Sequence, residues 1–397
     1  MTLDLSPEHE ELLARYRELA TSKFADRASG YDREAAFPLE DFADLIAAGL
    51  QAPLIPVSEG GAGLSRQNDL YTIWMITREL ARAHMALARC WEGHINCQML
   101  ISALGTEEQR SRWFSGVVEQ GHKWVAWSGE PQTRSPKEKS PIGTNVTETP
   151  EGFIVDGCKI FCTGAPAADW AILLVNTAGP GGGRHADAKV ASGLLMLACD
   201  LSDPSVTFDD SWWDPIGMRG TVSYLTRFNK TFIPRENLIG KPGQYLADEW
   251  QTRITPHYCA TFLGGAEAAH EYTLRYLATP GKSDDPFVQQ RVGEMAMNIE
   301  TSHLWMRRVS DLRAAGKDEE AKVAAARVRF QVERLTTSTL DHAIKACGAR
   351  SLNRPSPVER IHRDLSFYVR HDNIDHVLTT IGRHSLNEPH DLSFFKL

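Results

Sequence analysis

The chain has 397 residues, enough for a large hydrophobic core or for about two or three subdomains. Its formal net charge is -8 and no local run of Lys and Arg offsets it, which argues against nucleic acid as a partner. The opening MTLDLSPEHEELLARY is unlike a signal peptide, and no apolar stretch approaches the roughly 18 residues that cross a membrane. Seven scattered cysteines favour a reducing compartment over a disulfide framework. We therefore expect a cytoplasmic protein without a membrane partner.

Cys158 and Cys162, in GCKIFC, have a spacing that two metal ligands could share. A structural zinc site needs about four ligands, and the sequence offers no second pair of similar spacing nearby. We interpret both cysteines as core thiols and predict no metal.

Residues 6–120 are predicted to be mainly helical. In SPEHEELLARYRELATSKF, Ser6 can cap the helix, Pro7 suits its first turn, and apolar residues recur with helical spacing. The segments LEDFADLIAAGL and DLYTIWMITRELARAH carry similar apolar stripes, and the Pro- and Gly-rich APLIPVSEGGAGLS between them is expected to be a loop. This pattern predicts an N-terminal helical domain over residues 1–122.

From Lys123 onward, short segments rich in β-branched and aromatic residues predict strands. They are KWVAWSG, GFIVDGCKIFCTG, DWAILLVNT, SGLLMLACDL and LTRFNKTFIP, with the Gly-rich AGPGGGRHADAKVAS expected as a hairpin tip. Helical periodicity returns after PRENLIGKPG, and two segments, 288–312 and 320–347, are long enough for a bundle. The sequence therefore predicts an α+β protein with a middle β domain (123–240) and a C-terminal helical bundle (241–397).

Five segments, in the same order, resemble motifs of the acyl-CoA dehydrogenase superfamily. They are LISALGTEEQRSRWF, WSGEPQTRS, VDGCKIFCTGAPAADW, DPIGMRGTVSYLTRFNKTFIPRENLIG and GARSLNRPSPVERIHRDL. The likeness runs through nearly the whole chain. It implies the fold of that superfamily, with a β-barrel-like middle domain and a C-terminal four-helix bundle. It also implies bound FAD, with FMN as the alternative, and a small-molecule substrate.

The resemblance implies where the flavin would lie. Thr163 stands at the position that bonds flavin N5, and Phe161 at the position that lies against the flavin ring. Trp127, Ser128 and Gly129 match the stretch that meets the pyrimidine edge. A flat ring system needs aromatic cover and a few fixed hydrogen bonds, so these residue types suit the role. Taken singly, Thr163 would be better interpreted as a strand threonine and Phe161 as a core aromatic; the complete motif favours the flavin roles.

Two further positions bear on the cofactor. Ser135 matches a contact to the flavin phosphate or the substrate, although the usual A-G-S-D reads QTRS here. Arg275 matches the arginine that grips the FAD diphosphate across a subunit interface, which implies a homotetramer. The F-G that normally follows it is absent, and Pro286 falls where a glutamine is expected. The segment DPFVQQRVGEM resembles instead the flavin-dependent monooxygenase branch (group D, dibenzothiophene monooxygenase-like), which takes reduced flavin from a partner flavin reductase.

The segment VRHDNIDH, residues 369–376, bears on the choice between two reactions. Alignment with the R-D-x-x-x-x-x-x-Y-E-G-T helix of the superfamily places Asp372 at the catalytic glutamate of the dehydrogenases, one methylene shorter. The other base position of the superfamily falls near residues 253–255 and holds no carboxylate. In the monooxygenase branch a histidine is expected on this helix; His371 fits, and an imidazole titrates near neutral pH. Asp375 and His376 have no counterpart and are expected at the surface.

We therefore predict catalytic roles for His371 and Asp372. The favoured function is a monooxygenase that uses reduced flavin and O2 to hydroxylate a small organic substrate at carbon, nitrogen or sulfur. The alternative is FAD-dependent α,β-dehydrogenation of an acyl thioester with Asp372 as base, which needs hydrogen-bond reach to the proton. A non-catalytic flavoprotein, with VRHDNIDH as a solvated face, is the remaining alternative.

Overall fold

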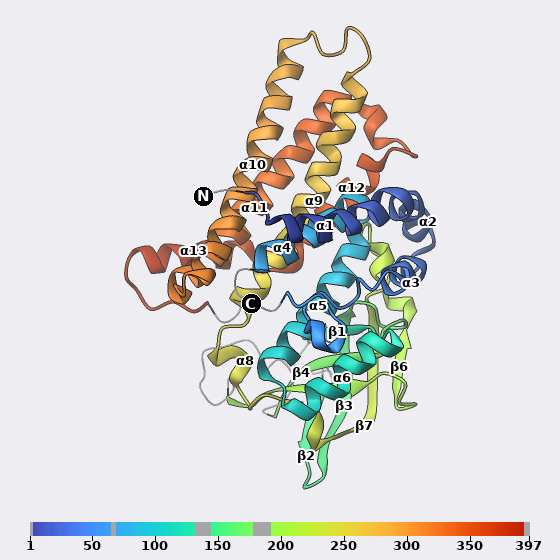
Figure 1. The fold of residues 1–397 in the computed structure, drawn as a ribbon, viewed down its shortest axis with the longest axis vertical. Helices are drawn as coiled ribbons and strands as arrows, with labels where there is room; N and C mark the ends of the chain where they lie inside the picture. The colour runs from blue at the N-terminus through green and yellow to red at the C-terminus, as the bar shows by residue number, and fades with distance from the viewer. Residues whose placement is uncertain (1–2, 65–68, 132–143, 178–191, 393–397) are drawn as a thin grey trace, which may run out of the picture.

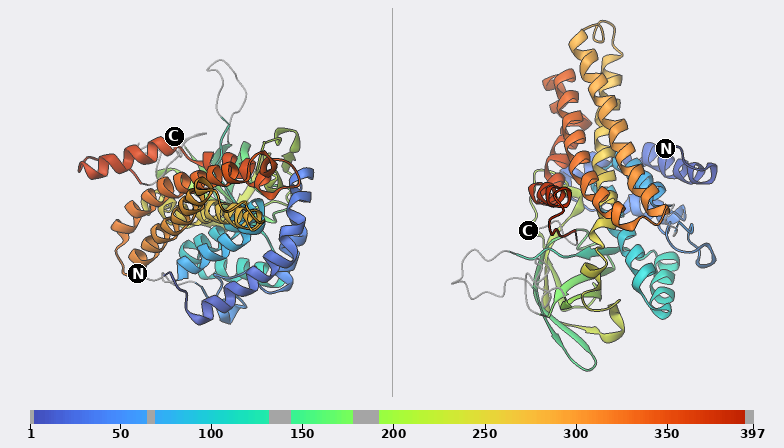
Figure 2. Two further views of the ribbon diagram at one scale, coloured as in Figure 1. Left: turned by 90° about the horizontal axis from the view of Figure 1, so that it is seen from above. Right: turned by 90° about the vertical axis from the view of Figure 1, so that its left-hand side faces the viewer.

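The computed structural model describes residues 3–64, 69–131, 144–177 and 192–392. Figure 1 shows the β strands at the lower end of the molecule, the N-terminal helices beside them, and the C-terminal helices rising along the long axis. The two views of Figure 2 show that the long C-terminal helices run side by side and extend well beyond the strands. None of the described helices combines the length and the apolar character that a bilayer-crossing segment needs.

The N-terminal part is helical, as the apolar stripes predicted. Its α-helices are α1 (Pro7–Leu19), α2 (Ala25–Glu34), α3 (Leu39–Ala47), α4 (Leu70–Ala83), α5 (Met85–Leu104) and α6 (Glu107–Gln120). Helix α1 begins where the Ser6 hydroxyl accepts a hydrogen bond from the backbone N–H of His9 at 3.2 Å. Helix α6 begins with a capping box between Thr106 and Gln109. Helix α5 is buried on almost every side, so it forms the centre of the helical layer.

The middle of the chain forms two four-stranded sheets. One contains β1 (Trp124–Trp127), β4 (Trp170–Asn176), β5 (Leu194–Asp200) and β8 (Leu238–Ile239), in that order. The other contains β2 (Thr144–Glu148), β3 (Gly152–Cys162), β7 (Tyr224–Pro234) and β6 (Val206–Asp209), in that order. Strands β1 and β4 pair in parallel and the remaining described pairs are antiparallel.

The two sheets share one hydrophobic core. It joins side chains such as Leu173 and Leu197 of the first sheet to Phe153, Val155 and Phe228 of the second. The described strands therefore pack as two sheets, and they do not close into the barrel that the resemblance implied. Most of the expected hairpin tip lies outside the described residues.

The C-terminal part is helical. Its helices are the short α8 (Gln244–Ala247), then α9 (Gln251–Leu277), α10 (Pro286–Ala314), α11 (Asp318–Cys347), α12 (Pro357–Tyr368) and α13 (Ile374–Ser385). One hydrophobic core joins α4, α9 and α11 through residues that include Leu80, Phe262 and Val328. Helix α9 thus connects the N-terminal helices to the C-terminal ones.

The segment VRHDNIDH is a junction and not part of one continuous helix. Helix α12 ends at Tyr368, a 3-10 turn spans Val369–His371, and Asp372 has an extended backbone. The Asn373 side chain then accepts hydrogen bonds from the backbone N–H groups of residues 375 and 376, so it caps α13. This cap explains why a helix-forming stretch is interrupted here.

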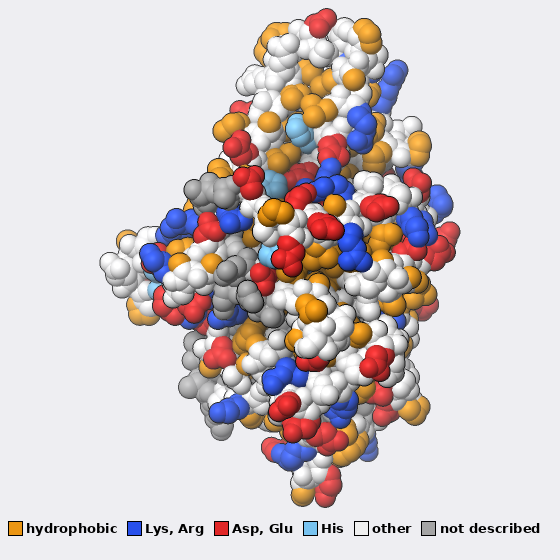
Figure 3. Space-filling model, viewed as in Figure 1, with side chains coloured by type: hydrophobic (Ala, Val, Ile, Leu, Met, Phe, Trp, Pro, Cys, Tyr) orange, Lys and Arg blue, Asp and Glu red, His pale blue; other side chains and the backbone are white. Residues whose placement is uncertain are grey.

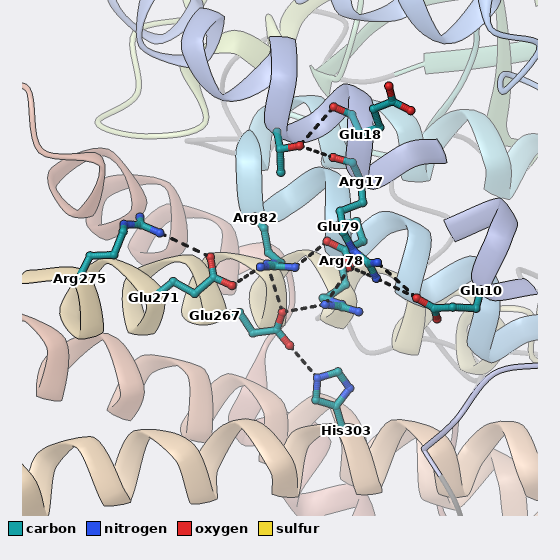
Figure 4. A network of polar contacts seen from close by, with 11 residues as sticks. Glu10, Arg17, Glu18, Arg78, Glu79, Arg82, Glu267, Glu271, Arg275 and His303 are labelled. Atoms are coloured by element: carbon teal, nitrogen blue, oxygen red, sulfur yellow. Dashed lines mark hydrogen bonds and ion pairs between the residues drawn. The ribbon is translucent and has the colours of Figure 1, made fainter. Parts of the chain in front are cut away.

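Charged side chains connect α1, α4, α9 and α10, as Figure 4 shows. Arg82 lies 2.7 Å from Glu79 and 3.6 Å from Glu267. Glu267 also contacts Arg78 at 3.1 Å and His303 at 2.6 Å. Glu79 and Glu267 therefore each have a guanidinium beside them, which offsets the cost of removing their charges from water.

Gly264 sets the distance between α9 and α4. A Cβ at this position would lie 2.4 Å from the carbonyl oxygen of Arg78 and 2.6 Å from the Cβ of Ala81. We predict that Gly264→Ala lowers the free energy of unfolding by about 1–3 kcal/mol, because the helices must separate. Gly30→Ala in α2 is the matched control: nothing lies within 4 Å of that position. Chemical denaturation should show no loss for Gly30→Ala; equal stability of the two variants would contradict the prediction.

Candidate active site

A pocket of about 480 Å³ lies where the ends of β1 and β3 meet helices α5, α9 and α12. Its walls include Ser128 and Gly129 after β1, Phe161 and Thr163 at the end of β3, and His371 of the α12–α13 junction. Segments far apart in the sequence are therefore brought together. The pocket contains five of the predicted site residues.

A row of hydroxyl groups forms one wall of the pocket. The Ser223 hydroxyl lies 3.1 Å from the Thr163 hydroxyl and 2.8 Å from that of Thr221. The Trp127 indole N–H donates to the backbone carbonyl of Thr163 at 3.1 Å, so the buried Trp127 ring supports Thr163 from behind. A hydroxyl both donates and accepts hydrogen bonds. The Thr163 hydroxyl accepts from Ser223, so it can still donate a hydrogen bond to a ligand or accept one through its second lone pair. Ser223 was not predicted from the sequence.

Phe161 gives the pocket an aromatic wall. Its backbone has a φ of +54°, in the left-handed region that phenylalanine rarely adopts, and it lies at an irregularity in the pairing of β3 with β7. The residue is 53% exposed, and the centroid of its ring lies 4.8 Å from that of Trp212 in an edge-to-face contact. A strained backbone that holds an apolar ring in the open is typical of a ligand contact.

The turn after β1 is held close to β3. A Cβ at Gly129 would lie 2.3 Å from the carbonyl oxygen of Ile160, so a side chain there would force the strands apart. The next residue, Glu130, accepts from the buried Lys159 ammonium at 2.5 Å and from the backbone N–H of Thr144 at 2.8 Å. A flat, hydrogen-bonding ring such as a flavin suits this site. The backbone at Gly129 leaves room for it, the Thr163 hydroxyl can bond to it, and the Phe161 ring can lie against it.

Asp372 lies behind His371 and does not reach the pocket. Its side chain is fully buried, and its Oδ2 lies 3.1 Å from Nε of Arg329 and accepts a hydrogen bond from the Tyr258 hydroxyl. Its Oδ1 lies 3.1 Å from Nδ1 of His371. Arg329 also donates to Glu333 at 2.6 Å. Asp372 is thus an ion-pair partner and orients the His371 ring, whose other side faces the pocket.

A second buried carboxyl, Glu92 of α5, lines the pocket itself. It accepts from Nη1 of Arg89 at 3.0 Å, from the Tyr368 hydroxyl at 2.9 Å and from the Thr261 hydroxyl at 3.3 Å. Burial raises the pKa of Glu92 to about 7, although Arg89, Tyr368 and Thr261 pull in the opposite direction. The available sequence signal was an Arg and a Glu three residues apart in a helix that contains no other Asp, Glu, Lys or Arg.

Asn96 completes the α5 face of the pocket. Its side-chain oxygen lies 2.7 Å from Nδ1 of His257, whose Nε2 lies 2.7 Å from the Thr77 hydroxyl. Burial lowers the pKa of His257 to about 3, so this imidazole is neutral near pH 7. The neutral ring holds Asn96 in place and adds no charge.

The remaining predicted positions lie elsewhere. Arg275 is 69% exposed, 3.9 Å from Glu271 near the far end of α9, and it borders a different cavity beside residues 354–357. Its contact with a cofactor across a subunit interface stays a prediction. Ser135 lies outside the described residues. Asp375 is exposed and His376 is half-buried.

Two family models match the chain: the N-terminal domain of acyl-CoA dehydrogenase over residues 6–120, and its C-terminal domain over residues 257–376. Together they cover more than half of the sequence. The chain belongs to the acyl-CoA dehydrogenase superfamily. The family assignment that rested on five ordered motifs is therefore confirmed.

Members of the superfamily with different activities resemble this chain. Dibenzothiophene monooxygenase from Rhodococcus erythropolis is 24% identical, over 99% of this chain and 100% of its own length. Cyclohex-1-ene-1-carbonyl-CoA dehydrogenase from Geobacter metallireducens is 24% identical, over 91% of this chain and 93% of its own. The structure of TdsC from Paenibacillus sp. A11-2 with FMN and indole has a TM-score of 0.84 and 21% identity, covering 98% of this chain and 100% of the other. The fold is that of this superfamily, and both predicted reactions fit these relatives.

The raised pKa of Glu92 should appear in the stability of the protein. Because the folded pKa of about 7 lies above the ordinary 4.5, the stabilisation it brings is full below pH 4.5 and is lost as the pH rises through 7. The unfolding free energy of wild type minus that of Glu92→Gln should therefore fall by about 3 kcal/mol over this range. Denaturation at a series of pH values measures the difference. The exposed Glu300→Gln should show no such trend, and a flat difference for Glu92→Gln would contradict the assignment.

Proposed function

We propose that this protein is a flavin-dependent monooxygenase, which uses reduced flavin and O2 to hydroxylate a small organic substrate at carbon, nitrogen or sulfur. The observation that carries the proposal is the arrangement at residues 371 and 372. The His371 ring lines the pocket, while the Asp372 carboxylate is buried behind it and bound to Arg329 and Tyr258. An imidazole that faces the pocket can donate or accept a hydrogen bond to a bound ligand.

Dehydrogenation of an acyl thioester is the alternative function. It needs a carboxylate within hydrogen-bond reach of the substrate proton. Asp372 would have to leave its contacts with Arg329, Tyr258 and His371 to serve as that base. Breaking a buried ion pair costs several kcal/mol, about 3–5 by analogy with other proteins. This cost favours the monooxygenase over the dehydrogenase.

The flavin would lie against Phe161, with Thr163 at N5 and with Ser128 and Gly129 at the pyrimidine edge. FAD is the favoured cofactor and FMN the alternative. When bound, the flavin supplies the electrons that reduce O2. The protein residues position it: the Phe161 ring offers apolar contact, and Ser223 leaves the Thr163 hydroxyl able to act as donor or acceptor.

We further propose a cytoplasmic homotetramer that receives reduced flavin from a separate reductase, with domains at 1–122, 123–240 and 241–397. The C-terminal helices would form a four-helix bundle and contribute to the subunit interface. Helix α10 supports this assembly, because Phe287 and Met297 on it are 68% and 62% exposed. Figure 3 shows hydrophobic side chains over the projecting end of these helices, at the top of the view. Arg275 would reach the FAD diphosphate of a neighbouring subunit.

Flavin binding should depend on Thr163. Titration with FAD and with FMN, followed by absorbance, should show that wild type binds FAD more tightly. Thr163→Val should bind both flavins about tenfold more weakly, because a hydrogen bond is lost. Thr207→Val, at an exposed position of β6, is the matched control and should bind as wild type does. Failure of wild type to bind either flavin would end the proposal.

The two residues of the junction should separate the two reactions. In the monooxygenase, His371→Ala should lower product formation by about 10²–10⁴-fold while reduced flavin is still consumed and hydrogen peroxide is released. Asp372→Asn should be milder in turnover, although it weakens the buried contact with Arg329. If the protein is a dehydrogenase, Asp372→Asn should instead abolish anaerobic flavin reduction by an acyl-CoA, and His371→Ala should be tolerated. Full activity of both variants in both assays would remove the site assignment.

A further inference from the structure

The guanidinium of Arg89 lies in the pocket wall, and most of its N–H donors make no hydrogen bond to the described residues. Among the described residues its contacts are one hydrogen bond from Nη1 to Glu92 at 3.0 Å and the face of the Tyr368 ring at 5.7 Å. A guanidinium has five N–H donors in a fixed plane. Most of these donors therefore have no acceptor in the described part of the chain, while the side chain borders the pocket.

The charges that line the pocket are opposite to those of the whole chain. The chain carries a formal net charge of -8. Of the described side chains lining the pocket, the cations are Arg89 and Arg370, the latter 3.7 Å from Glu333, and Glu92 is the one carboxyl. The neighbouring Asp372 is screened from the pocket by burial and by its pairing with Arg329. The pocket therefore favours a negatively charged ligand.

Glu92 does not fully neutralise Arg89. Its two oxygens are shared among Arg89, Tyr368 and Thr261. Its pKa of about 7, raised by burial, means that a large fraction is protonated near neutral pH. In that protonated fraction the positive charge of Arg89 has no carboxylate counterion among the described residues that line the pocket. An anion that enters would supply one.

Apolar side chains from four different elements also line the pocket. Leu100 on α5, Leu174 on β4, Ile254 on α9 and Phe367 on α12 contribute to its lining. A ligand that fills this space needs an apolar body in addition to its charged group. A free inorganic anion would leave most of this surface uncovered.

We propose that the substrate of this pocket is an apolar organic acid, whose carboxylate or sulfinate oxygens are bound by the Arg89 guanidinium. Arg89 is then the residue that selects the substrate class, since planar guanidinium groups bind two oxygens of one acid side by side. This inference rests on the proposed function, because it concerns the substrate of the same pocket.

The experiment compares two probes of equal shape and different charge. 2-Naphthoate and 2-naphthamide are titrated into the protein by calorimetry, with and without bound FAD. Naphthoate should bind wild type roughly tenfold or more tightly than naphthamide, the size of one charge-assisted hydrogen-bond pair. Arg89→Met should remove this preference, and Arg89→Lys should retain part of it because the charge remains. Arg334→Met, an exposed arginine on α11, is the matched control and should change neither affinity.

The outcomes separate this inference from the proposed function. Equal affinity of wild type for the acid and the amide overturns the inference, and this comparison needs no variant. Unchanged naphthoate affinity in a folded Arg89→Met overturns it too, as does a loss confined to FAD affinity, which would make Arg89 a cofactor contact. Failure of wild type to bind flavin is a different result: it removes the proposed function, while the acid–amide comparison on the flavin-free protein still tests Arg89.

Discussion

The arrangement of the pocket depends on one buried guanidinium. Arg329 of α11 is fully buried and contacts Asp372, Glu333 and the backbone carbonyl of Val369. A buried arginine without acidic partners would be strongly destabilising, so α11 and the α12–α13 junction must meet in one register. That register turns the His371 ring toward the pocket. The interaction is structural in itself, and its effect on function comes from where it places the neighbouring histidine.

The pocket shows how two buried carboxyl groups can differ. Asp372 is bound to Arg329, and its side chain is closed off from the pocket. Glu92 has Arg89 beside it, but burial has the larger effect and raises its pKa to about 7. Each carboxyl also accepts a hydrogen bond from a buried tyrosine, Tyr258 or Tyr368. Asp372 therefore serves as an ion-pair partner, while Glu92 can change its protonation near neutral pH.

Much of the fold followed from the sequence, because five motifs stood in the expected order and the periodicity changed from helix to strand to helix. Thr163, Phe161 and His371 were also placed at the pocket by motif position. Arg89 and Glu92 were missed. Periodicity alone shows that α5 is buried, and only the packing of distant helices reveals that this face of it borders a cavity.

Residues 369–376 were expected to lie on a helix, and a local interaction explains why they do not form one continuous helix. The residues around this junction favour a helix, but Asn373 offers its side chain to the next backbone N–H groups and starts a new helix. The β domain was predicted correctly as strands, yet its closure was not. Whether strands join as a barrel or as two sheets depends on pairings between residues far apart in the chain.

The left-handed backbone of Phe161 also has an evolutionary consequence. Glycine would adopt a φ of +54° without strain, whereas phenylalanine there costs on the order of 1 kcal/mol or more. The substitution that best suits the backbone would also remove the aromatic wall of the pocket. Selection for thermostability alone would thus favour loss of the ring that the proposed function places against the flavin, and a stabilised variant with glycine at 161 is expected to bind a flat ligand more weakly.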